Sequence, residues 1–156
     1  AVEGPTSGFI TGKRIYIEKC KAQYKGVGRA AKIGKECMMG IAKAVELYAQ
    51  RDEEKEAARQ KQIVDELVEG LSKLNYLKVS VKADDAGRKI YRAKVDVIPG
   101  VSKLTAREIV KRLQSGTPAV YTRNHFVDQW TILIDPRTML PGDAALIIQR
   151  FQELGR

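Results

Sequence analysis

A long helical stripe of apolar residues constrains this chain more than any other feature. From Glu36 onward apolar residues recur at helical spacing, and after a charged middle the same face continues to Leu74. The members of the stripe are Met38, Ile41, Ala42, Val45, Tyr48, Val64, Leu67, Val68, Leu71 and Leu74. The charged middle, residues 51–62, has mixed signs and helix-favouring composition, which is typical of a solvated helix face rather than a nucleic-acid patch. One helix over 36–74 is predicted, about 55–60 Å long, and it needs a larger body to pack against.

The hydrophobic period changes from 3.6 to 2 after residue 75. Residues 77–81 and 90–97 alternate between apolar and polar, and the turn sequence ADDAGR separates them, so a β-hairpin is predicted. The further predicted elements are a helix at 105–113, strands at 119–121 and 130–134, and an amphipathic helix at 142–154. This order predicts an α+β layer, a small antiparallel sheet with helices on one face.

The first 35 residues carry weaker signals. Phe9 to Thr11 is predicted as a short strand, and Lys13 to Ala22 as a helix. The stretch 25–35, KGVGRAAKIGK, has three glycines and four basic residues but no hydrophobic period. A basic loop is therefore predicted there.

The charge and composition of the chain limit the classes of partner and the environment that we expect. With 28 basic and 19 acidic residues the formal charge is +9, which favours nucleic acid, a phosphorylated metabolite or an acidic surface. No apolar run has the length of a membrane helix, and the opening AVEGPTSG lacks the features of a signal peptide, so we expect no membrane association, and further sequence ahead of Ala1. Cys20, Cys37 and a single histidine support no metal site or disulfide framework, and indicate a reduced, cytoplasmic protein.

Generic catalytic motifs are missing from the sequence, including GxGxxG, the Walker loop, GxSxG and HExxH. His125 has no triad companion, and a structural role is expected for it. Two segments instead combine glycines with polar or basic residues: EGPTSG at 3–8 and GRAAKIGKE at 28–36. Both patterns suit an anion, although a plain turn and a solvated loop are the alternatives.

The physical chemistry of the two segments differs. In the first, close glycines let the backbone approach an anion, while Thr6 and Ser7 add hydroxyl donors. In the second, Arg29, Lys32 and Lys35 recur at intervals of three before a helix N-terminus. Three cations and the positive end of a helix dipole are therefore expected to converge on one anionic group.

The order of these segments and their amino-acid sequences indicate a family. AVEGPTSGFITGK, GVGRAAKIGKE, the long helix and IDPRTMLPGD together resemble the pyridoxal-phosphate proteins related to selenocysteine synthase, most closely the D-glucosaminate-6-phosphate ammonia lyase group. The resemblance covers essentially the whole chain. It implies the C-terminal portion of an aspartate-aminotransferase-type, fold type I, α/β protein. Its parts would be the end of the large cofactor domain (1–35), the long connecting helix (36–75) and the small C-terminal α+β domain (76–156).

The resemblance also implies pyridoxal 5'-phosphate as cofactor and a homodimer or higher homo-oligomer. In this family a Ser-Gly-x-Lys segment carries the Schiff-base lysine, and the residues after it look like AVEGPTSG. The lysine is therefore expected just before Ala1, which leaves no catalytic residue in the chain. The residues matching the family's GPxxG segment, near the cofactor phosphate, are Gly4, Pro5, Thr6, Ser7 and Gly8.

Substrate contacts follow from the resemblance in the same way. Arg29 and Lys32 match two basic positions that meet anionic substrate groups in selenocysteine synthases, where an arginine stands in place of Lys32. This exchange replaces a bidentate fork by a point charge. Lys35 follows in the same loop. Arg123 and Arg137 are the candidates for binding a substrate carboxylate, and the choice between them stays open, as does a surface role for either.

The implied activity is β-elimination with ammonia release from a phosphorylated amino sugar acid such as D-glucosaminate 6-phosphate. One alternative is selenium transfer onto seryl-tRNA, in which tRNA becomes a partner. Another is a basic RNA-binding module without catalysis, which would need stacking aromatics on its sheet. The aromatic residues of the second half are Tyr76, Tyr91, Tyr121, Phe126, Trp130 and Phe151, and they form no RNA-binding signature.

Overall fold

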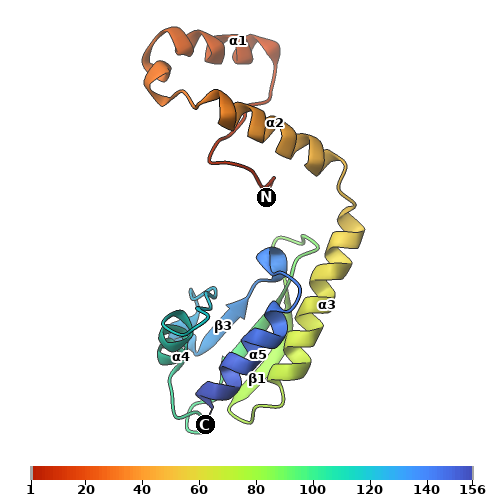
Figure 1. Cartoon of the computed structure of the whole chain (residues 1–156), viewed down its shortest axis with the longest axis vertical. Helices are drawn as coiled ribbons and strands as arrows, with labels where there is room; N and C mark the ends of the chain where they lie inside the picture. Colours follow the sequence, from red (N-terminus) through yellow and green to blue (C-terminus); the bar gives the residue numbers. More distant parts are fainter. Residues whose placement is uncertain (1, 156) are drawn as a thin grey trace. The chain divides into compact units, whose positions relative to one another are not determined.

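The computed structural model describes residues 2–155 and forms two compact units, residues 1–52 and residues 53–156, which Figure 1 shows in the colours of the sequence. The boundary falls inside the predicted long helix. Helix α2 covers Lys35–Ala49 and helix α3 covers Glu53–Leu71, so the prediction of one unbroken helix is wrong. The reason is a new N-terminus in the sequence: Asp52 is a residue type favoured before a helix, and Glu53, Glu54 and Glu56 fill the first turn of α3.

The first unit is helical. Helix α1 covers Arg14–Ala22, as predicted, and two short 3-10 helices follow, η1 over Gln23–Lys25 and η2 over Val27–Ala31. The predicted basic loop thus contains helical turns. The predicted strand at residues 9–11 is wrong, because no described segment pairs with it and a strand needs a neighbour for its backbone hydrogen bonds. Phe9 and Ile10 remain exposed.

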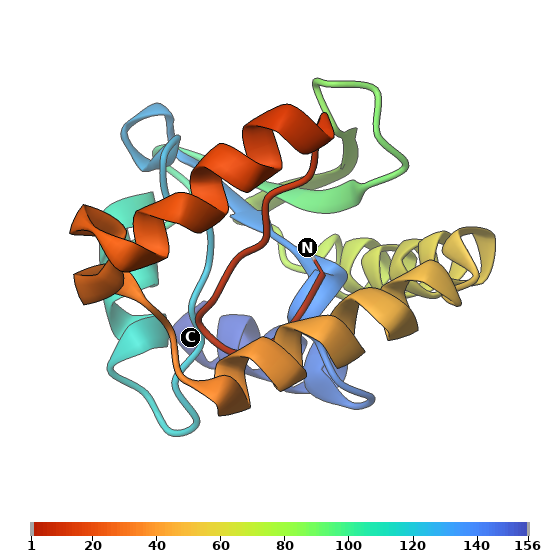
Figure 2. The ribbon, with the colours of Figure 1, turned by 90° about the horizontal axis from the view of Figure 1, so that it is seen from above.

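The N-terminal segment of the first unit packs closely against α2. Figure 2 shows it running beside α2 on its way to α1. A Cβ atom placed on Gly40 would come within 2.7 Å of Pro5, and one on Gly4 within 3.1 Å of the Ala44 side chain. Small residues on α2 therefore permit this approach. Of the described hydrophobic residues in this unit, Ala44 is the one that is buried.

The second unit is built on an antiparallel sheet in the order β1-β2-β3. Strand β1 covers Leu77–Ala83 and pairs with β2, Tyr91–Val97, in the register Leu77↔Val97 to Ala83↔Tyr91, which confirms the hairpin. Gly87 supplies the left-handed conformation (φ +72°) that the connecting turn requires. Strand β3, Thr131–Ile134, pairs with β2 on its other side. Residues 119–121 form no strand, because the Val120 amide donates instead to the Leu113 carbonyl at the end of the preceding helix (2.9 Å).

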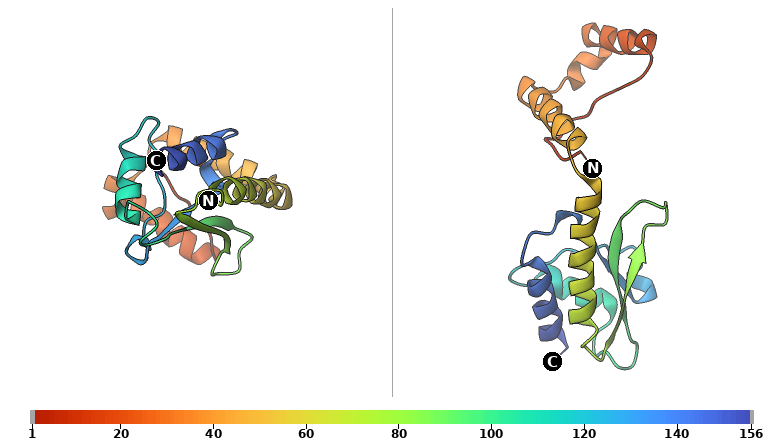
Figure 3. Two further views of the ribbon diagram at one scale, coloured as in Figure 1. Left: turned by 90° about the horizontal axis from the view of Figure 1, so that it is seen from below. Right: turned by 90° about the vertical axis from the view of Figure 1, so that its right-hand side faces the viewer.

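Helices on one face of the sheet complete this unit, as the sequence predicts (Figure 3). Helix α4, Ala106–Gln114, starts with a capping box in which Thr105 and Glu108 bond each other's backbone amides. The short 3-10 helices η3, Val127–Gln129, and η4, Pro136–Thr138, flank β3. Helix α5, Asp143–Leu154, packs against α3.

The core of the second unit lies between the sheet and these helices. The apolar stripe of α3 reaches it through Val64, Leu67 and Leu71, all completely buried. A Cβ atom on Gly70 would come within 2.3 Å of Ile148 Cδ1, which explains a glycine inside a helix: it lets α3 and α5 approach. Burial raises the pKa of Tyr76 to about 12, and the Tyr76 hydroxyl donates to the Phe151 carbonyl (2.6 Å).

Candidate functional site

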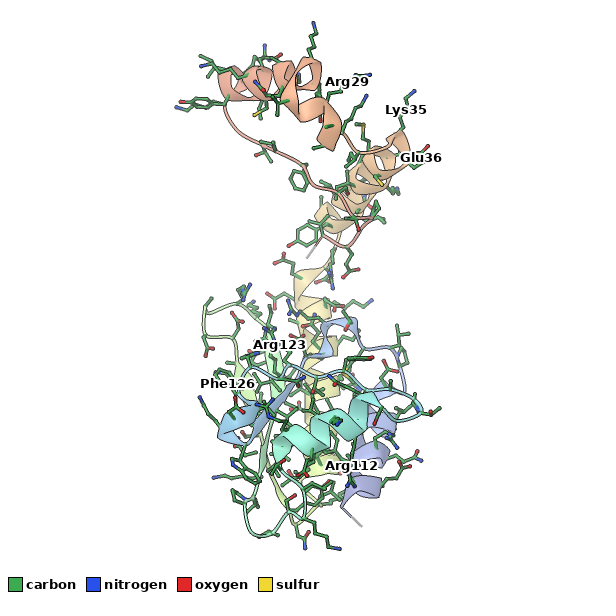
Figure 4. All side chains as sticks on the ribbon, turned by 90° about the vertical axis from the view of Figure 1, so that its left-hand side faces the viewer. Arg29, Lys35, Glu36, Arg112, Arg123 and Phe126 are labelled. Atoms are coloured by element: carbon green, nitrogen blue, oxygen red, sulfur yellow. The ribbon has the colours of Figure 1, made fainter. Side chains whose placement is uncertain are left out.

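The basic residues predicted in the first unit lie at its surface. Arg29 is on η2, Lys32 directly follows η2, and Lys35 is the first residue of α2; all three are exposed. Figure 4 shows Arg29 and Lys35. No described carboxylate forms an ion pair with any of the three, in contrast to many other basic residues between positions 2 and 155. The three charges are therefore available to an external anion.

The expected role of the α2 N-terminus needs a correction. Glu36 folds its carboxylate back over the start of the helix, so that a Cβ on Gly34 would lie 2.7 Å from Glu36 Oε2. A carboxylate at this end already interacts favourably with the helix dipole. An external anion near Arg29, Lys32 and Lys35 would thus depend on the side-chain cations more than on the helix terminus.

The glycine segment 4–8 is exposed except for the partly buried Ser7. Ser7 Oγ donates to the Pro5 carbonyl (2.8 Å), which closes a small turn. A Cβ placed on Gly8 would meet nothing within 4 Å, so the backbone there is open to an approaching group. Pro5, against Gly40, fixes the base of the segment. The lysine expected ahead of Ala1 lies outside the described residues.

In the second unit, Arg123 and Arg137 meet at one carboxylate. Arg137 forms a fork with Asp135, Nε to Oδ1 and Nη2 to Oδ2, both at 2.8 Å. Arg123 reaches the same Oδ2 through Nη1 at 3.2 Å. Arg123 precedes β3 and bonds Leu133 through its backbone, while Asp135 directly follows β3. The sheet thus brings together two of the predicted arginines.

A third arginine, Arg92 on β2, was not predicted as a site residue. Its side chain is 8% exposed and links Asp135 (2.9 Å) to Asp84 (3.1 Å). Asp84 also receives a fork from Arg88 at 2.8 and 3.0 Å. We call these six residues the Asp135 cluster: Asp84, Arg88, Arg92, Arg123, Asp135 and Arg137. Sequence reasoning missed Arg92 because it alternates with apolar residues of β2, as Lys94 and Asp96 do, and so resembles a solvent-facing strand residue.

The cations of the cluster control the ionisation of both carboxylates. Arg88, as the main cause, and Arg92 hold the pKa of Asp84 well below its usual range, against the opposing effect of burial. For Asp135 burial is the largest single influence and opposes ionisation, but hydrogen bonds from Arg137 and Arg92 outweigh it and lower the pKa. Both carboxylates are therefore charged at any moderately acidic or neutral pH.

Acid should weaken the second unit through these two groups. Their pKa is lower in the folded than in the unfolded chain, where it is about 3.9, so their stabilisation is fully present above that pH and is lost as the pH falls towards the folded values. We expect the free energy of unfolding to decline more steeply below about pH 4 in the native protein than in Asp135→Asn. Urea titrations at pH 7, 4 and 3 would test this, and parallel declines would contradict it.

The described residues bear on three expectations, on metal binding, membrane spans and RNA-stacking aromatic residues. Within residues 2–155 no three His, Cys, Asp or Glu side chains gather in a way that could hold a metal ion. No described helix is long and apolar enough for a bilayer span. Tyr76 and Phe151 are buried in the core, which removes two of the six aromatics that an RNA-stacking sheet would use.

The architecture places the chain in a class: a small antiparallel sheet covered by helices, preceded by a helical unit, agrees with the predicted part of a fold type I pyridoxal-phosphate enzyme. A D-glucosaminate-6-phosphate ammonia lyase of Salmonella typhimurium is 38% identical over 154 residues, which cover 99% of this chain and 41% of the lyase. A solved structure of D-glucosaminate-6-phosphate ammonia-lyase superposes with a TM-score of 0.81 at 38% identity, over 97% of this chain and 40% of that one. No protein-family model matches.

Two further relatives are more distant. A 5'-C-glycyluridine monooxygenase-decarboxylase of a Streptomyces species is 34% identical over 96% of this chain and 38% of its own length. An L-seryl-tRNA(Sec) selenium transferase of Aquifex aeolicus is 25% identical over 97% of this chain and 36% of its own. The chain is related to the pyridoxal-phosphate enzymes of the selenocysteine synthase type and, among them, to D-glucosaminate-6-phosphate ammonia lyase, as predicted. It spans about 40% of the length of these relatives.

Proposed function

We propose that this chain is part of a pyridoxal-phosphate-dependent lyase that releases ammonia by β-elimination from a phosphorylated amino sugar acid. The observation that carries the proposal is the 38% identity to D-glucosaminate-6-phosphate ammonia lyase over 99% of the chain. The exposed bases Arg29, Lys32 and Lys35 of the first unit suit an anionic group of such a substrate.

The residues present fit the phosphate end of the cofactor. Segment 4–8 offers backbone amides, the Thr6 hydroxyl and an open approach at Gly8, and its closely spaced glycines let the backbone come near an anion. When bound, pyridoxal phosphate acts as the electron sink for the bond changes at the substrate α-carbon. The base for the α-proton would be the lysine expected ahead of Ala1, so the chain's own residues bind and orient.

Arg29, Lys32 and Lys35 are the residues we assign to an anionic group of the substrate in the first unit. A lysine at position 32 gives a strongly hydrated point charge where a planar arginine fork would favour bidentate geometry. Such a site tolerates a phosphate in several orientations. Lys35 contributes least in this proposal, because the neighbouring Glu36 carboxylate offsets part of its field.

Ammonia release from D-glucosaminate 6-phosphate by the full-length protein tests the proposed function. We expect activity in the native protein and a loss of about 10- to 100-fold in kcat/KM in Arg29→Ala and in Lys32→Ala, since each removes a charge-assisted hydrogen bond. The matched control is Lys19→Ala, another exposed base of the same unit, on α1.

Other products would point to the other relatives. Dioxygen consumption with decarboxylation of a glycyl nucleoside would favour the monooxygenase-decarboxylase, and selenium transfer to seryl-tRNA would favour the transferase. If the native protein releases no ammonia from any phosphorylated amino sugar acid, the proposal is wrong.

The environment and assembly of the protein are also part of the proposal. Cys20 and Cys37 are free thiols, which supports a reducing, cytoplasmic location. We further propose that residues 1–35 belong to the larger cofactor domain and that the protein is a homodimer or higher homo-oligomer. The first unit supports both proposals, because its apolar side chains Ile10, Val27 and Met39 are 71–92% exposed and few of its other apolar side chains are buried. Exposed apolar surface of this kind is typical of an interface.

A further inference from the structure

Most of the positive charge of the chain lies in one short stretch of the first unit. Residues 13–35, which we call the basic limb, contain eight basic residues and one acidic residue, a net charge of +7 out of +9 for the chain. The limb comprises α1, η1, η2 and the residues up to the start of α2. Its basic residues, all of them exposed, are Lys13, Arg14, Lys19, Lys21, Lys25, Arg29, Lys32 and Lys35.

Little of this charge is neutralised by the residues that the structure describes. Glu18, the acidic residue of the limb, pairs with Lys21 at 2.9 Å. No carboxylate between positions 2 and 155 forms an ion pair with any of the other seven bases. Outside the limb the charges are nearly balanced, because 20 of the 28 basic and 18 of the 19 acidic residues lie there. The basic limb is therefore a local source of positive potential.

The contacts of the proposed function account for only part of this charge. Arg29, Lys32 and Lys35 are assigned to an anionic group of the substrate, which leaves the five bases of the limb from Lys13 to Lys25 without a role. Packing does not explain these five, since none of the residues of α1 or η1 is buried. A long-range electrostatic role remains open to them.

The five bases lie near enough to Arg29 to act on the same anion. Lys25 ends η1, which contacts η2, and it stands four positions before Arg29, so their Cα atoms are at most about 14 Å apart. Helix α1 contacts η1 and is about 13 Å long. The Debye length is about 30 Å at 0.01 M salt and about 3 Å at 1 M. The bases of α1 and η1 therefore attract an anion at Arg29 in dilute salt, and concentrated salt screens them.

Resting on the proposed function, we propose that the basic limb draws the anionic substrate towards Arg29, Lys32 and Lys35 through its electrostatic field, and that its bases from Lys13 to Lys25 act without touching the substrate. The phosphate of such a substrate carries a charge of about −2 near neutral pH. In water and dilute salt, one base about 12 Å away strengthens the binding of this phosphate about twofold. Positive potential around a site also raises the local concentration of an anionic substrate and its association rate.

Neutral variants of the full-length protein, measured at two salt concentrations, test the field. Lys13→Gln/Arg14→Gln/Lys25→Gln removes three charges and should raise KM for D-glucosaminate 6-phosphate about 5- to 10-fold at 0.01 M salt, with kcat unchanged. At 1 M salt the triple variant and the native protein should agree within about twofold, because the field is screened. A single change such as Lys19→Ala should alter KM at most about twofold, far less than the loss of a direct contact from Arg29.

Two further variants distinguish a field from specific contacts. Glu18→Gln removes the acidic group of the limb and should lower KM about twofold in dilute salt, an effect opposite in sign to general damage. Adding Gln23→Lys to the triple variant places a charge at another exposed position of η1, the helix that carries Lys25. This addition should recover about twofold in KM, because a field depends on a charge and its distance, whereas a contact depends on one particular side chain.

Each result decides a specific point. A rise in KM of the triple variant that persists at 1 M salt and is not relieved by Gln23→Lys would show direct contacts, and it overturns the inference. An unchanged KM at 0.01 M salt overturns it as well, and a lower melting temperature would then assign these bases to an acidic surface elsewhere in the protein. In both cases the proposed function stands. If the native protein releases no ammonia from any phosphorylated amino sugar acid, the proposed function fails and the inference fails with it.

Discussion

Replacing Phe151 by alanine should cost the second unit about 3–5 kcal/mol of unfolding free energy. Phe151 lies on α5, is completely buried, and its ring fills the core between α5 and the sheet. Truncation removes its apolar surface from the core and leaves a cavity that helices held by close contacts such as Gly70–Ile148 cannot readily close. Urea unfolding of the full-length protein followed by circular dichroism at 222 nm would measure the change.

The control for this variant is Leu140→Ala. Leu140 is a large apolar residue of the same unit but is 69% exposed, so its truncation should change stability by less than about 0.5 kcal/mol. Equal losses in the two variants would mean that Phe151 is not in the core. A shift in the urea m value of Phe151→Ala alone would indicate a change in the unfolded ensemble rather than in packing.

Removing the charge of Arg92 should lower the unfolding free energy of the second unit by an amount similar to that of Phe151→Ala. In Arg92→Met the carboxylates of Asp84 and Asp135, 5% and 16% exposed, lose the cation that lies between them. Breaking a buried ion pair from one side costs about 3–5 kcal/mol, and we expect the lower part of that range, because Asp84 keeps its fork from Arg88 and Asp135 keeps its fork from Arg137. The same variant should raise the pKa of Asp135, which makes the loss smaller at pH 4 than at pH 7.

A second substitution shows whether the charge is responsible. Asp84→Asn in the Arg92→Met background should restore part of the stability, since it removes one of the two carboxylates that lost their buried arginine and keep only a more exposed one. Arg88→Ala, which breaks a pair whose arginine is 62% exposed, should cost much less than Arg92→Met. If Arg92→Met costs no more than Arg88→Ala, the cluster contributes little to folding.

Local patterns predict the elements of the second unit well. The hairpin follows from alternation on both sides of ADDAGR, and α4 and α5 follow from apolar periodicity with clear start signals at Thr105 and near Gly142. In these segments the residues that fix the conformation are neighbours in the chain. The apolar residues of α3 are likewise correctly predicted to face a core.

The remaining features depend on contacts between distant residues. The charged residues 51–62 interrupt the apolar stripe but favour helix by composition, so the break between α2 and α3 is not apparent from periodicity; the acidic first turn of α3 indicates it. The expected strand at 119–121 does not form, because the Val120 amide donates its hydrogen bond to the Leu113 carbonyl of α4. Arg92 looks like a surface residue of an alternating strand, and only the positions of Asp84 and Asp135, 8 and 43 residues away, explain its burial.

The position of Trp130 has a practical consequence. It is the chain's single tryptophan, it follows η3 immediately ahead of β3, and it packs partly against the core of the second unit. Intrinsic fluorescence excited at wavelengths selective for indole therefore reports on the second unit alone, while Tyr16, Tyr24 and Tyr48 belong to the first. Tyrosine emission mixes the two units, because Tyr76, Tyr91 and Tyr121 lie in the second, so the indole is the probe that separates the unfolding of residues 53–155 from that of the first unit.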